Sequence, residues 1–81
     1  MFIYKAAVVG AGAMGAEIAQ TISFSGVPVV LKDVDQARVD RGLAVIQKIY
    51  QRRVDRGKMS QEEMQQKLAL VTGTTTLEAL R

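Results

Sequence analysis

The sequence predicts an α/β protein built around a parallel β-sheet. Short apolar runs typical of buried strands alternate with stretches whose apolar residues recur every three to four positions, as in helices. A glycine-rich turn separates the first predicted strand from the first predicted helix. The predicted order is strand, helix, strand, long helix, short helix, strand, which favours parallel strands joined by right-handed crossovers. Three strands make about half of a doubly wound sheet.

Composition narrows the possible functions. A chain of 81 residues allows one small domain. It contains no Cys and no His, which excludes disulfide bonds, thiolate metal sites and His-dependent active sites, and we expect no metal. The net charge of +3 and the aromatic content of 5% do not suggest a nucleic-acid-binding protein. No apolar stretch is long enough for a membrane span and no signal peptide is recognised, so a cytoplasmic location is expected.

The first half of the chain predicts a strand, a helix and a second strand. The apolar run over residues 4–9 ends at Gly10 and is typical of a strand buried on both faces. A helix is then indicated by apolar residues at four-residue spacing: Met14, Ile18 and Ile22. Gly26 is suited to end this helix, because glycine tolerates the left-handed conformation. Residues 27–32 predict the second strand.

A long helix is predicted over residues 39–54. Its apolar stripe has spacings of three and four: Val39, Leu43, Ile46, Tyr50 and Val54. Asp33 or Asp35 is placed to cap its start, and Gly57 to end it.

The remaining residues predict a short helix and a third strand. Ser60 followed by Glu63 is a capping-box pattern, so a short helix is expected to begin there. Residues 68–72 predict the third strand, and residues 76–80 the start of another helix.

The glycine-rich turn is the strongest functional signal. Six residues match the pattern G-x-G-x-x-G: Gly10, Ala11, Gly12, Ala13, Met14 and Gly15. Gly10 permits a tight turn, Gly12 lets a pyrophosphate approach the backbone, and Gly15 lets the helix pack close to the strand. The N–H groups around Gly12, Ala13 and Met14 would then face an anion at a helix N-terminus. The alternative is that the glycines serve packing alone, and the surrounding strand and helix signals favour the dinucleotide.

Asp33 follows the second predicted strand, where dinucleotide-binding domains place an acidic residue. Its carboxylate would accept hydrogen bonds from the adenosine ribose hydroxyls and repel a 2′-phosphate, which favours NAD over NADP. Lys32 should point away from the ribose, because successive strand side chains face opposite ways. The alternative role for Asp33 is that of a helix N-cap, for which Asp35 is also available.

Basic residues gather on the long helix. They fall on the face opposite the apolar stripe: Arg38, Arg41, Lys48, Arg52 and Arg56. A solvated helix face is the favoured interpretation. The alternative is a site for a phosphorylated substrate or an acidic partner.

These features together resemble a known family. The carrying segments are VVGAGAMGAEIAQ, GVPVVLKDVD, an Arg-Gly pair in the long helix, RGKMS and TTTLEAL. From residue 5 to about residue 80 the chain resembles the N-terminal part of the NAD-binding domain of 3-hydroxyacyl-CoA dehydrogenases, most closely the dehydrogenase segment of the multifunctional fatty-acid oxidation α subunit. The resemblance implies a partial Rossmann-type doubly wound sheet (β-α-β-α-α-β, three strands), with residues 1–81 forming the N-terminal part of a single dinucleotide-binding domain.

The resemblance also implies a reaction. The complete enzyme would oxidise a 3-hydroxyacyl-CoA to the 3-oxoacyl-CoA with NAD, a step of fatty-acid β-oxidation. The family's catalytic His and Glu lie downstream of this region, so the chain itself should carry no catalytic residue and be inactive alone. A basic family position that meets the CoA phosphates falls on Arg53. A neighbouring serine position falls on Ile46, which departs from the family pattern.

Two alternatives remain at this point. One is the equivalent segment of another β-hydroxyacid dehydrogenase, and the other is a non-catalytic interaction module that uses the basic helix face. In the 3-hydroxyacyl-CoA dehydrogenases and in the other β-hydroxyacid dehydrogenases alike, the first strand would normally pair with a fourth strand. Because this chain has none, we expect the strand over residues 4–9 to form an exposed edge and the chain to form a homo-oligomer.

Overall fold

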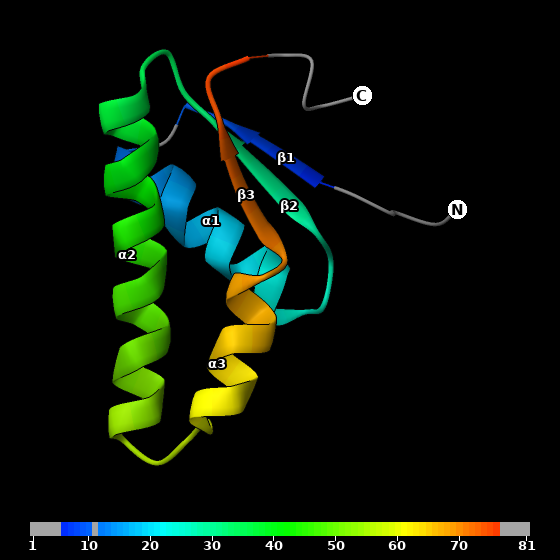
Figure 1. Ribbon diagram of the computed structural model, residues 1–81, viewed down its shortest axis with the longest axis vertical. Helices are drawn as coiled ribbons and strands as arrows, with labels where there is room; N and C mark the ends of the chain where they lie inside the picture. Colours follow the sequence, from blue (N-terminus) through cyan, green and yellow to red (C-terminus); the bar gives the residue numbers. More distant parts are fainter. Residues whose placement is uncertain (1–5, 11, 77–81) are drawn as a thin grey trace.

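The computed structural model describes residues 6–10 and 12–76 and contains six elements in the predicted order. In chain order they are β1 (Ala6–Val9), α1 (Gly12–Phe24), β2 (Val29–Lys32), α2 (Gln36–Asp55), α3 (Gln61–Leu68) and β3 (Val71–Thr74). Figure 1 shows the long α2 beside α1, and α3 leading into β3.

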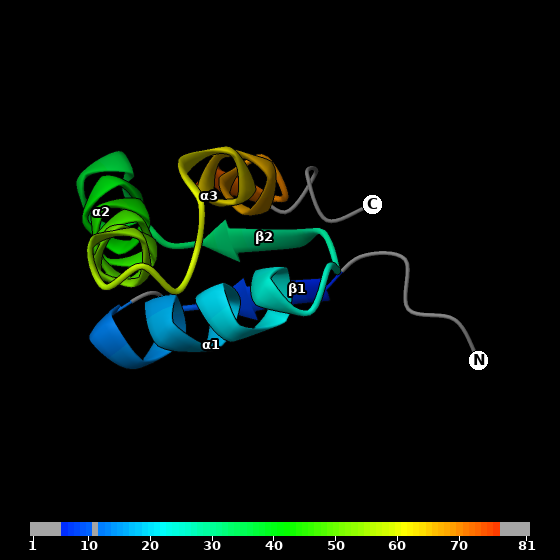
Figure 2. The ribbon, with the colours of Figure 1, turned by 90° about the horizontal axis from the view of Figure 1, so that it is seen from below.

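The strands form one parallel sheet in the order β1-β2-β3. Ala7 pairs with Val30, and Val30 pairs with Thr72, so one face of the sheet presents these three residues in a row. The helices lie together on the opposite side of the sheet, with α1 packed against β1 and β2 and α2 packed against β3 (Figures 1 and 2). Within the described residues β1 is therefore an edge strand, as expected.

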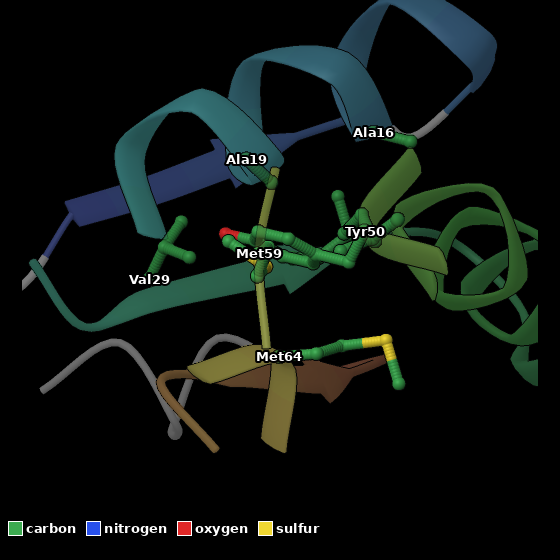
Figure 3. Close-up of a cluster of buried hydrophobic side chains, with 8 residues drawn as sticks. Ala16, Ala19, Val29, Tyr50, Met59 and Met64 are labelled. Carbon is green, nitrogen blue, oxygen red and sulfur yellow. The ribbon is translucent and has the colours of Figure 1, made fainter. Parts of the chain in front are cut away.

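The core lies between the sheet and the helices, and Figure 3 shows part of it. Eight buried residues form it: Ala16, Ala19, Val29, Leu31, Ile46, Tyr50, Met59 and Met64. Gly73 in β3 brings α2 close to the sheet, because a Cβ atom there would collide with the side chain of Val39. The apolar stripe predicted for the long helix is thus its buried face.

The helix starts follow the sequence signals. Asp35 is the N-cap of α2, where its carboxylate accepts a hydrogen bond from the Arg38 N–H at 2.8 Å. This leaves Asp33 outside the cap. Ser60 caps α3 as predicted by accepting from the Glu63 N–H at 3.0 Å, and its hydroxyl donates to the Glu63 carboxylate at 3.3 Å.

A buried polar contact joins α1 to α2. The Ser23 and Tyr50 hydroxyl oxygens lie 2.6 Å apart, and the Tyr50 hydroxyl also donates to the Gln20 carbonyl at 3.2 Å. In the described part of the chain every buried side-chain nitrogen and oxygen has a hydrogen-bond partner.

One local expectation was wrong. The third strand begins at Val71 and not at Leu68, because Leu68 completes α3 and two residues of turn precede the pairing with β2. The stripe that indicated α1 does not mark its buried face, since Met14 and Ile18 are 75% and 48% exposed. Small residues pack there instead: Gly15, Ala16 and Ala19. The helix expected after β3 falls mainly on residues 77–81, and the first two residues of the first predicted strand on residues 4–5, outside the described part.

Candidate cofactor-binding site

The glycine turn joins β1 to α1 at the edge of the sheet where the strands end. Gly10 adopts a φ of +84° and donates its N–H to the carbonyl of Lys32 at 2.9 Å, which ties the turn to the end of β2. A Cβ atom on Gly15 would collide with the carbonyl oxygen of Gly10. The expected roles of these glycines in the tight turn and the close helix packing are therefore visible in the geometry.

The N-terminus of α1 is open for an anion. Gly12 begins the helix with a φ of +42°, and, apart from its chain neighbours and the backbone of its own helix, no atom of the described residues lies within 4 Å of the place where its Cβ would be. The two residues before it, Gly10 and Ala11, carry no side-chain acceptor, whereas Asp35 and Ser60 cap the other two helices. These two residues therefore offer no side-chain cap to the first N–H groups of α1, which is the arrangement that favours a phosphate.

Asp33 lies immediately after β2, at the same edge of the sheet as the glycine turn. Its N–H donates to the Thr74 carbonyl at 3.2 Å, and its Oδ1 accepts from the Val34 N–H at 2.6 Å. The residue is 7% exposed, so its carboxylate is held in a defined place by the backbone on both sides.

An open pocket of about 410 Å³ connects the two features. Its lining comes from the start of α1, the end of β2 and the first half of α2: Gly12, Ala13, Asp33, Arg38, Arg41, Gly42 and Val45. In open parallel sheets ligands bind outside the carboxyl ends of the strands, and this pocket lies there. The space above Gly12, which a Cβ would occupy, and the acidic residue Asp33 in the same pocket fit the pyrophosphate and ribose of a dinucleotide.

The pocket also contains two residues that the sequence did not connect with Asp33. Arg38 and Arg41 belong to the basic face that was expected to be solvated, and both are exposed, yet they line the pocket beside Asp33. The missed signal was their distance from Asp33: they follow it by five and eight residues, which places them on the first turns of α2.

The other predicted residues occupy separate positions. The Met14 side chain lies on the outer face of α1, in a shallow pocket with Glu17 and Ile18, so its expected contribution is limited to its N–H group. Lys32 is not among the residues that line the 410 Å³ pocket, as expected from strand alternation.

Arg53 lies far from this pocket, about 18 Å farther along α2 than Arg41. Its guanidinium carbon is 4.4 Å from the centre of the Phe24 ring at the end of α1. It lines a second pocket, of about 320 Å³, with four other residues: Ile49, Arg52, Arg56 and Lys58. Ile46, the position that departs from the family pattern, is fully buried in the core.

Other kinds of site are not found in the described residues. No group of three or more acidic side chains in residues 6–10 and 12–76 is arranged to hold a metal ion. Within the same ranges, no helix has the length and apolar character needed to cross a membrane.

Comparison with known proteins agrees with the geometry. Residues 5–81 match the family model of the 3-hydroxyacyl-CoA dehydrogenase NAD-binding domain. The chain is 39% identical over 79 residues to a fatty acid oxidation complex subunit alpha of Idiomarina loihiensis, and 35% identical over 79 residues to a peroxisomal fatty acid beta-oxidation multifunctional protein of Arabidopsis thaliana. Each alignment covers 98% of this chain and 11% of the relative.

A solved structure gives the same result for the fold. The model superposes on the crystal structure of (S)-3-hydroxybutyryl-CoA dehydrogenase from Ralstonia eutropha with a TM-score of 0.92 and 32% identity, over 98% of this chain and 28% of that one. The chain therefore spans about a tenth of the curated relatives and about a quarter of the solved enzyme. The matched domain is an NAD-binding domain, and NAD is its cofactor. The chain belongs to the family of 3-hydroxyacyl-CoA dehydrogenase NAD-binding domains.

Proposed function

We propose that this chain holds the adenosine and pyrophosphate half of NAD in the 410 Å³ pocket. The observation that carries the proposal is that Gly12 and Asp33, which are 21 residues apart in the sequence, line the same pocket at the N-terminus of α1. When bound, NAD supplies the hydride acceptor, and the protein supplies its orientation.

Each residue of the turn has a separate part in this proposal. Gly10 and Gly15 shape the backbone, and Gly12 leaves room for the pyrophosphate. The N–H groups of Gly12, Ala13 and Met14 donate to it. The Asp33 carboxylate accepts hydrogen bonds from the ribose hydroxyls, and charged hydrogen bonds of this kind contribute roughly 1.5–3 kcal/mol.

The proposed reaction belongs to a longer polypeptide. There, residues 1–81 would be the N-terminal part of one dinucleotide-binding domain, and the enzyme would oxidise 3-hydroxyacyl-CoA to 3-oxoacyl-CoA in fatty-acid β-oxidation. The names of the sequence relatives support a multifunctional α subunit as the parent. The 81-residue chain alone should transfer no hydride, since its residues include none of the catalytic pair. A cytoplasmic location is part of the proposal and is tested by imaging a fluorescent fusion.

Arg53 is proposed to meet the CoA phosphates. Its support is the second pocket, where Arg52, Arg53, Arg56 and Lys58 place four cations around one opening. Arg53→Gln should raise the KM for the acyl-CoA in the parent enzyme and leave the KM for NAD unchanged. Because Arg53 also stacks on Phe24, the control is Phe24→Leu, which removes the ring and keeps the cation. An equal rise in the CoA KM for both variants would assign Arg53 a structural role instead.

NAD titration tests the main proposal. Isothermal titration should give a lower NAD affinity for Asp33→Ala than for the unchanged protein, in the polypeptide that naturally carries this segment. Asp35→Ala is the matched control: it removes a carboxylate two residues away that caps α2 and does not line the pocket. An unchanged NAD affinity in Asp33→Ala, or an equal loss in both variants, would contradict the ribose assignment.

The substrate class needs a different assay. The parent polypeptide should reduce acetoacetyl-CoA with NADH, which another β-hydroxyacid dehydrogenase would not do. NAD binding without this activity would favour the segment of another dehydrogenase. The absence of NAD binding would favour the interaction module.

A further inference from the structure

We infer that the pocket contains a latent site for a 2′-phosphate, formed by Arg38 and Arg41, which the charge of Asp33 alone keeps closed to NADP. The inference rests on the proposed NAD site and adds the residues that decide between the two cofactors. It predicts that removal of one negative charge makes the pocket accept NADP without any new basic residue.

The two guanidinium groups lie at the end of α2 next to Asp33. Arg38 and Arg41 are one turn apart on α2, and both line the pocket with Asp33. Long side chains on a helix lean toward its N-terminus, which for α2 is the end next to Asp33. The Arg41 Nε lies 3.4 Å from the Ala37 carbonyl, so this side chain does run back toward that end.

The N–H donors of Arg38 and Arg41 are available to a phosphate. Arg38 is paired with Asp35 at 3.6 Å, and both side chains are more than half exposed, so the pair is weak and easily exchanged for a phosphate. Among the described residues, the terminal guanidinium nitrogens of Arg38 and Arg41 make no hydrogen bond. Guanidinium groups are the preferred partners of phosphate, since their fork of N–H donors matches its oxygens.

The negative charge of Asp33 opposes the binding of a 2′-phosphate. An acidic residue at the end of β2 accepts the ribose 2′-hydroxyl, and an Arg nearby accommodates a 2′-phosphate. The lining of this pocket contains both. A phosphate placed between them would be attracted by two cations and repelled by the buried Asp33 carboxylate, which is 7% exposed and little screened by water. Whether the pocket attracts or repels a 2′-phosphate therefore depends on the charge of Asp33.

The test is the affinity for NADP and NAD in the parent polypeptide. Asp33→Asn is the main variant, because an amide oxygen can still accept from the Val34 N–H while the charge is lost. We expect it to bind NADP about tenfold or more tightly than the unchanged protein does, and to bind NAD more weakly. Adding Arg38→Ala or Arg41→Ala to Asp33→Asn should abolish the gain. Adding Arg52→Ala, the same change on the same helix outside this pocket, should leave it.

Two further measurements secure the interpretation. Adenosine 2′,5′-bisphosphate compared with 5′-AMP should reproduce the gain, which would locate it at the 2′-phosphate. Circular dichroism reports folding, and Asp33→Ser is the second variant if Asp33→Asn does not fold.

The outcomes separate this inference from the proposed function. If the unchanged protein binds no NAD, the proposed function is wrong and the inference is wrong with it. If the unchanged protein binds NAD and neither Asp33 variant gains affinity for NADP, the inference alone is wrong. A gain that Arg52→Ala removes as fully as Arg38→Ala would also contradict it, because it would reflect net charge and not a site.

Discussion

The carbonyl oxygen of Gly10 occupies the space that a Cβ atom of residue 15 would need. This contact brings the first turn of α1 against the end of β1. It also fixes where the helix N-terminus lies relative to Asp33 at the end of β2. The pocket between them is therefore a consequence of how closely a helix and a strand can approach when two glycines meet.

Gly15→Ala should destabilise the fold. Helix propensity alone predicts the opposite sign, because Ala in a helix interior is about 1 kcal/mol more favourable than Gly. The collision with Gly10 involves backbone, which cannot rotate away, and overpacking of this kind costs about 1–3 kcal/mol. Urea denaturation followed by circular dichroism measures the difference. An increase in the free energy of unfolding would mean that the helix and strand are not in this close contact.

Gly12→Ala should weaken NAD binding about tenfold, since even one methyl group occupies the space proposed for the pyrophosphate. Gly26→Ala is the matched control. Both glycines have a positive φ, of +42° and +93°, and both have open space at the Cβ position, so each variant places an alanine at a positive φ without a collision with other side chains. Gly26 follows the other end of α1, away from the pocket. Equal NAD affinities for the two variants, by isothermal titration, would remove Gly12 from the site.

Tyr50 should make stability depend on pH in the alkaline range. Burial raises the pKa of its phenol above the ordinary value of 10.0, although hydrogen bonds to Ser23 and Gln20 and the charge of Arg53 act against this. The neutral phenol is favoured in the folded state, so its contribution is full below pH 10 and decreases as the pH rises from 10 toward the folded pKa.

The variant for this prediction is Tyr50→Phe. It should cost about 1 kcal/mol below pH 10, because the Ser23 hydroxyl still donates to the Gln20 carbonyl at 2.9 Å. The difference in unfolding free energy between the unchanged protein and Tyr50→Phe should shrink above pH 10. A difference that stays constant from pH 8 to pH 11 would show that the phenol is not buried.

The 81-residue chain should self-associate through β1. Ala6 donates its N–H to the carbonyl of Pro28, just before β2, and Gly10 donates to the carbonyl of Lys32 at the end of β2. The alternate N–H groups of Ala7 and Val9 therefore face the open edge of the described sheet. Val9 is 65% exposed, and no charged residue lies within β1. Light scattering over a concentration series should reveal a dimer, and Ala7→Lys should shift it toward monomer. A folded monomer at all concentrations would contradict this prediction.

Much of this structure was available from the sequence. The order of elements, the capping-box pattern at Ser60 and the buried stripe of α2 follow from local patterns in the sequence. The start of β3 was missed because the sequence around Leu68 is equally compatible with the end of a helix and with the start of a strand. Only the pairing with β2 decides between these two assignments. The spacing of Met14 and Ile18 predicted α1 correctly but did not identify its buried face, because small residues pack against the sheet there and these larger apolar residues are exposed.

The candidate site, too, was only partly predictable from the sequence. The glycine turn and Asp33 are recognisable because a motif ties each residue to a role. Arg38 and Arg41 belong to no such motif, and the helical periodicity that placed them on a solvated face was correct. Their proximity to Asp33 depends on the angle at which α2 leaves the sheet, which is a tertiary property.

The most direct test of the proposed cofactor site is an NMR titration of the ¹⁵N-labelled protein with NAD. The amide signals of Gly12, Ala13 and Met14, and those of Asp33 and Val34, should shift most as NAD is added. The signals of α3 and of the last turns of α2 should stay in place. Largest shifts around Arg52 and Lys58, with the glycine turn unaffected, would contradict the proposed site.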